Sequence, residues 1–128
     1  MVFSEKILET KKELETMGHE VLIPNFVNAY LGKDEKEKER LTQYHKSEKD
    51  AIRAYWEEIQ KSDAILVLNY TRRGIENYIG GNVLMEIGFA HVLGKRIFLM
   101  NPIPEIEYYK SEIEAVKPVV INSDLKKI

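Results

Sequence analysis

The segment that most constrains the fold is residues 62–101, with the sequence SDAILVLNYTRRGIENYIGGNVLMEIGFAHVLGKRIFLMN. It opens with a continuous apolar run at residues 64–68, which is typical of a parallel strand buried on both faces. A polar, glycine-rich loop follows, and then an apolar helix over residues 83–93, with Asn82 as its expected cap and Gly94 at its end. Residues 96–100 predict the next strand. This unit indicates an α/β fold with a mostly parallel sheet.

The flanking sequence continues the alternation of helices and strands. The patterns predict a helix capped by Ser4 and ended by Gly18, a strand over 19–24, helices over 47–61 and 106–116, and a strand over 118–121. Only three residues precede the first helix, too few for the strand that normally opens such a fold. We therefore expect a sheet that lacks its usual first strand. A natural late start, a wrong start site and a strand supplied by a partner chain are three open explanations.

Composition narrows the class of protein. A chain of 128 residues with 44% hydrophobic residues fits a single domain spanning residues 1–128. Nineteen basic against 21 acidic residues give a net charge of -2, which argues against nucleic acid or an anionic membrane as the partner. There is no cysteine, no signal-like N-terminus and no membrane-length apolar run. We expect a cytoplasmic protein without a metal or other cofactor.

Glu86 stands out because it is a lone acid on an apolar helix. From Gly74 to Gly94 the only other charged side chain is Glu76. Burying a carboxylate is costly unless it is paired, capped or used. Helical side chains lean back towards the N-terminus, and parallel sheets bind ligands beyond the carboxyl ends of their strands. Glu86 is therefore expected to face the ligand-binding end of the sheet.

The loop before this helix supplies the remaining candidate site. Its glycines allow positive φ and close approach of backbone N–H groups to a ligand, and the following helix start suits an anionic or sugar group. Two tyrosines could stack on a base or simply close the loop. The candidate ligand-binding residues are Asn69, Tyr70, Asn77, Tyr78, Gly80, Gly81 and Asn82.

The segments SDAILVLN and GGNVLMEIGFAHVLGKRIFLMN resemble the core of the nucleoside 2-deoxyribosyltransferase-like family, which includes deoxyribosyltransferases and 2′-deoxynucleoside 5′-phosphate N-hydrolases. The resemblance implies a three-layer, flavodoxin- or Rossmann-like sheet with helices on both faces. It implies that Glu86, in the pattern Glu-hydrophobic-Gly-x-Ala, attacks the sugar of a nucleoside or its 5′-monophosphate. It also implies a dimer or larger homo-oligomer, because family members complete their pockets with a neighbouring subunit.

Several alternatives stay open at this stage. The chemistry is hydrolysis or transfer, and the acid that protonates the leaving base is not identified, with Asp50 a weak candidate. A non-catalytic nucleotide-binding module with a degenerate pocket is the second hypothesis, and a purely structural domain is the third. In the third, Glu86 pairs with a neighbouring cation such as His91 or Lys95.

Overall fold

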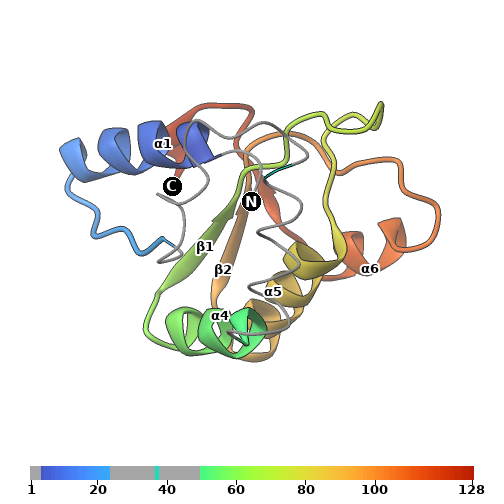
Figure 1. The fold of residues 1–128 in the computed structure, drawn as a ribbon, viewed down its shortest axis with the longest axis horizontal. Helices are drawn as coiled ribbons and strands as arrows, with labels where there is room; N and C mark the ends of the chain where they lie inside the picture. The colour runs from blue at the N-terminus through green and yellow to red at the C-terminus, as the bar shows by residue number, and fades with distance from the viewer. Residues whose placement is uncertain (1–3, 24–36, 38–49) are drawn as a thin grey trace. The chain divides into compact units, whose positions relative to one another are not determined.

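The computed structural model of this chain describes residues 4–23, 37 and 50–128. The chain divides into two compact units, Met1–Tyr55 and Trp56–Ile128, and each is described by itself. Helix α4 (Ala51–Gln60) runs across the boundary between them. The second unit holds β1 (Ala64–Val67), α5 (Gly81–Val92), β2 (Arg96–Leu99), α6 (Lys110–Ala115), β3 (Val119–Val120) and a final 3-10 turn (Leu125–Lys127) (Figure 1).

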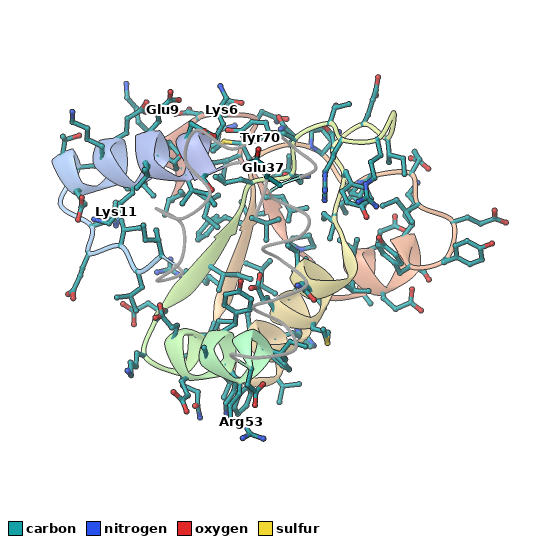
Figure 2. All side chains as sticks on the ribbon, viewed as in Figure 1. Lys6, Glu9, Lys11, Glu37, Arg53 and Tyr70 are labelled. Carbon is teal, nitrogen blue, oxygen red and sulfur yellow. The ribbon has the colours of Figure 1, made fainter. Side chains whose placement is uncertain are left out.

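The first unit contributes helix α1 (Ser4–Thr16), which ends where the sequence predicts. Gly18 has a φ of 93°, and the N–H groups of Gly18 and His19 donate to the carbonyls of Glu15 and Leu14 at 3.1 Å each. This left-handed termination favours glycine because other residues carry a Cβ penalty there. Charged side chains, among them Lys6, Glu9 and Lys11, line the helix (Figure 2).

The prediction of a strand at residues 19–24 is wrong for residues 19–23, the part of it that the structure describes. Residues 19–23 have no strand conformation, and residue 24 lies outside the described ranges. A strand needs a neighbour for its backbone N–H and carbonyl groups, and a short apolar run says nothing about whether that neighbour exists. The predicted start of the 47–61 helix also lies outside the described residues.

The second unit confirms the α/β fold with a parallel sheet. Its three strands lie in the order β1-β2-β3, with Ala64 paired to Arg96 and Phe98 paired to Val119 in parallel register. Two strands are close to their predicted bounds, whereas β3 is shorter than residues 118–121. Helix α6 is also shorter than expected, because Tyr109, with φ −145° and ψ 17°, is non-helical and delays its start.

The two faces of the sheet carry separate apolar clusters. Side chains alternate along a strand, so Val67 and Leu99 lie on one face while Leu66 and Phe98 lie on the other. The first face packs against Ile59 of α4, Ile87 and Ala90 of α5, and Ile113 of α6. The second packs against the C-terminal segment through Leu125 and Ile128. Helix α5 is thus fixed on the first face of the sheet.

Asn69 fastens the carboxyl ends of β1 and β2 together. Its side chain is fully buried, and its Nδ2 donates to the carbonyls of Asn101 at 2.8 Å and Pro102 at 3.1 Å. Its Oδ1 accepts from the backbone N–H of Asn101 at 2.9 Å, and Asn101 Nδ2 donates to the carbonyl of Asn69 at 3.1 Å. We call this arrangement the asparagine clamp. It satisfies the backbone groups that parallel pairing leaves free where the strands end.

Replacing Asn69 by alanine should lower the free energy of unfolding by about 3 kcal/mol, because three hydrogen bonds are lost and their buried backbone partners stay unsatisfied. Asn101→Ala is the matched control. It removes one hydrogen bond of the clamp and should cost about 1 kcal/mol. Urea unfolding followed by circular dichroism measures both values. Equal costs for the two variants would contradict the central role of Asn69.

Candidate functional site

The loop between β1 and α5 is an ordered arm rather than an irregular connection. Within it, Arg72 and Ile75 exchange backbone hydrogen bonds of 3.1 and 3.0 Å across a two-residue turn. Arg73 and Gly74 occupy that turn with φ of 55° and 74°, as a tight hairpin of the primed type requires. The N–H of Tyr78 donates to the carbonyl of Tyr70 at 3.1 Å and closes the base of the arm. Figure 1 shows the arm leaving the end of β1 and returning to α5.

Helix α5 begins two residues earlier than predicted, so the assignment of Asn82 as its cap is wrong. Gly80 is the N-cap, with φ −84° and ψ 175°, and no side chain caps the helix. A Cβ at position 80 would lie 3.3 Å from Cε1 of Tyr78, which is tighter than most Cβ contacts. The absence of a side chain at Gly80 therefore lets Tyr78 lie against the helix start. Asn82 becomes the second residue of the helix, and within the described ranges no side chain accepts from the first-turn N–H groups.

Glu86 lies in the second turn of α5 and is partly buried. Within the described part of the chain its carboxylate has no hydrogen bond and no ion pair, so the proposed pairing with His91 or Lys95 is not formed. Burial raises the pKa of Glu86 from 4.5 to about 7. Loss of water is the largest cause of this shift, and it outweighs the opposing electrostatic attraction. Near neutral pH the carboxyl group therefore exists in both protonation states.

The neighbours of Glu86 on the helix explain its burial. Ile87 and Ala90 point into the apolar cluster beneath the sheet. Residues three and four apart share a helix face, so Glu86 has Asn82 and Val83 as its neighbours one turn before it and Phe89 and Ala90 one turn after it. Phe89 makes an edge-to-face contact with Trp56 of α4, with ring centroids 5.2 Å apart and planes at 80°. Glu86 thus stands between a polar helix start and an aromatic pair.

Only some of the predicted binding residues lie on the segment that leads into α5, the helix that carries Glu86. Tyr78, Gly80, Gly81 and Asn82 lead directly into α5, and Asn77 precedes them with a φ of 57°. Asn69 has no exposed surface, and its amide is committed to the asparagine clamp. Tyr70 packs with the cluster on the second face of the sheet, opposite α5. Tyr70 is labelled at the end of β1 in Figure 2.

Sequence reasoning missed Tyr109 and the arginine pair Arg72–Arg73. The Tyr109 hydroxyl donates to the backbone carbonyl of Ile79, 30 residues earlier in the chain. A contact at that separation leaves no local signal in the sequence. The pair Arg72–Arg73 does have a signal, because Arg-Arg-Gly in a polar loop is a recognisable turn.

Asp50 is the weak candidate for the acid that protonates the leaving base, but its side chain caps the start of α4. Its Oδ1 accepts from the N–H of Arg53 at 3.3 Å, and its Oδ2 lies 3.4 Å from the Arg53 guanidinium.

Among the residues that the structure describes, no group of three His, Asp or Glu side chains could hold a metal ion. No helix in the described ranges is long and apolar enough to cross a membrane.

Comparisons with protein-family models, with curated proteins and with solved structures found no match for this chain. The resemblance of residues 62–101 to the nucleoside 2-deoxyribosyltransferase-like family therefore stays a prediction from the sequence pattern.

Glu86→Gln should show that the native carboxyl group costs stability at neutral pH. The folded-state pKa of about 7 exceeds the ordinary value of 4.5, so the folded state binds the extra proton between these values. Stability then falls as pH rises through this range, and the penalty reaches about 3 kcal/mol above pH 7. The free energy of unfolding of Glu86→Gln, measured relative to that of the native chain, should therefore rise by up to about 3 kcal/mol between pH 4.5 and pH 8.

Chemical unfolding at a series of pH values measures this difference. Glu76→Gln is the control, because Glu76 is an exposed glutamate on the arm, and that variant should follow the native chain. A pH-independent difference between Glu86→Gln and the native protein would contradict the burial of an unpartnered carboxyl group.

Proposed function

We propose that this protein cleaves or transfers at the N-glycosidic bond of a nucleoside, a deoxynucleoside or its 5′-monophosphate, with Glu86 as the nucleophile. The observation that carries the proposal is a partly buried carboxyl group without a hydrogen bond or ion pair among the described residues, one and a half turns into α5. Proteins rarely keep such a group unless it is used. The sequence pattern Glu-hydrophobic-Gly-x-Ala around Glu86 supports the same choice.

The chemistry follows from a carboxylate facing a sugar. An Oε atom of Glu86 bonds to C1′ while the bond from C1′ to the base nitrogen breaks, and the base leaves with that electron pair and takes up a proton. A negative charge beside C1′ stabilises the positive character that develops there. Water or a second base then displaces Glu86 from C1′. The first route is hydrolysis and the second is transfer.

The remaining residues of the proposed site are Asn77, Tyr78, Gly80, Gly81 and Asn82. They lie on the arm and at the α5 start, where backbone N–H groups and aromatic surface are available to hydroxyl, phosphate or base groups. We leave Asn69 and Tyr70 out of the proposed site, because one is in the clamp and the other packs on the second sheet face. The three-layer, flavodoxin-like arrangement with helices on both faces belongs to the same proposal.

The test is a panel of nucleosides, deoxynucleosides and their 5′-monophosphates, with and without an added free base. Glu86→Gln should lower the rate of base release or exchange by about 10⁴-fold or more, because the nucleophile is lost. Glu76→Gln on the exposed arm should leave the rate unchanged. Across pH, kcat/KM should rise through about pH 7, since only the ionised form of Glu86 attacks.

The outcomes separate the competing hypotheses. A rate that falls as pH rises through 7 would make Glu86 a general acid and overturn its role as nucleophile. Absence of turnover, combined with a nucleotide-dependent rise in melting temperature, would favour the non-catalytic binding module. If neither turnover nor a thermal shift is observed, the hypothesis of a purely structural domain is favoured.

We also propose that the chain forms a dimer or larger homo-oligomer. Within the described residues, β1 pairs with β2 on one edge and with no strand on the other. An open strand edge composed of apolar residues favours pairing with another chain. The aromatic face of α4 gives no support, because Tyr55 is buried and Trp56 packs on Phe89.

Light scattering on the purified protein should give at least twice the 14.9 kDa chain mass. The carbonyls of Asp63 and Val67 accept hydrogen bonds from the β2 side, so the backbone N–H of Leu66, one position out of phase, faces the open edge. Leu66→Pro removes that N–H and should weaken the association if the open edge carries it. Because this proline could also disturb the fold, circular dichroism must first show that its helix content is kept. A monomeric native protein would refute the proposal.

A further inference from the structure

Tyr109 connects the α6 region to the arm that precedes Glu86. It stands at the N-cap position of α6, and its hydroxyl donates to the carbonyl of Ile79. Ile79 immediately precedes Gly80, the N-cap of α5. Figure 1 shows α6 beside the start of α5. One side-chain hydrogen bond therefore links the starts of two helices.

The acceptor of this hydrogen bond is in a place where an unsatisfied carbonyl would be costly. The Ile79 residue is only 1% exposed, and its side chain belongs to the apolar cluster beneath the sheet. In the described ranges no backbone N–H donates to its carbonyl. A buried carbonyl in an irregular segment needs a partner, and the Tyr109 hydroxyl is that partner.

Tyr78 approaches the same segment. Its ring fills the space beside Gly80, where an added Cβ would lie 3.5 Å from the hydroxyl oxygen. Burial raises the pKa of the Tyr109 hydroxyl, and the neighbouring Tyr78 raises it by a smaller amount. The Tyr109 hydroxyl therefore keeps its proton and remains a donor throughout the neutral range. Two phenol groups hold residues 79–80 from different elements.

We propose that Tyr109 is a positioning residue that fixes the start of α5, and through it the carboxyl group of Glu86 and the first-turn N–H groups. The catalytic consequence rests on the proposed function, whereas the positioning itself does not. Glu86 follows Gly80 by six residues on one continuous helix, so a shift of the helix start moves the carboxyl group too. Small misplacements of a reacting group lower rates strongly.

Tyr109→Phe tests the proposal because it removes one hydroxyl group and keeps the ring. Tyr108→Phe is the matched control, since Tyr108 is the adjacent tyrosine and is 92% exposed. Amide hydrogen exchange read by NMR should become about tenfold faster in Tyr109→Phe at the two hydrogen-bonded amides that flank residues 79–83, those of Tyr78 and Leu84, matching the loss of one buried hydrogen bond. Exchange in β2 should stay unchanged, and the Tyr108→Phe protein should match the native one.

The kinetic measurement uses the substrate identified in the panel. Tyr109→Phe should lower kcat by about tenfold with a smaller change in KM, because the nucleophile rather than the binding surface is displaced. Unchanged exchange at the amides of Tyr78 and Leu84, or an equal increase throughout the second unit, would refute positioning by Tyr109. If the native protein shows no turnover, the proposed function fails while the exchange comparison still decides the role of Tyr109.

Discussion

The asparagine clamp between β1 and β2 is the interaction on which the rest of the second unit depends. Two parallel strands of four residues each have few hydrogen bonds of their own, and Asn69 adds three more where the strands end. The arm begins at the next residue, so the clamp sets the point and direction from which it leaves. The position of this first residue of the arm affects three later features, namely the Arg72–Ile75 turn, the Tyr70–Tyr78 hydrogen bond and the start of α5.

A second constraint is the conflict between burial and charge at Glu86. The helix start favours the ionised carboxylate, while the apolar residues around α5 favour the protonated form. Burial prevails and raises the pKa to about 7. A domain selected for stability alone would place an apolar residue at this position, because Ile87 and Ala90 on the same helix are already in the core. The stability cost expected of Glu86 supports the role proposed for it.

The sequence predicted those features that are fixed by local chemistry. β1 and β2 were predictable because continuous apolar runs are typical of buried parallel strands. The helix ends at Gly18 and Gly94 were predictable because a left-handed helix end favours glycine. The helix start was misplaced because Gly80, Gly81 and Asn82 are all acceptable caps locally. In the structure Gly80 is the cap, and the Tyr78 ring lies where a Cβ at that position would make a close contact. The clamp and the Tyr109 contact join residues about 30 positions apart, a separation at which composition and periodicity carry no information.

A pKa near 7 is compatible with a nucleophile because the relevant state is the complex with substrate. A sugar placed beside Glu86 excludes further water, which opposes ionisation, but the positive character that develops at C1′ favours the carboxylate more strongly as the bond to the base breaks. The interaction is thus weaker in the ground state than in the transition state, which is the condition for catalysis. A carboxylate already held by a salt bridge would lose that partner's stabilisation on bonding to the sugar. In the proposed mechanism, the absence of such a partner for Glu86 among the described residues leaves the carboxylate available to react with the sugar.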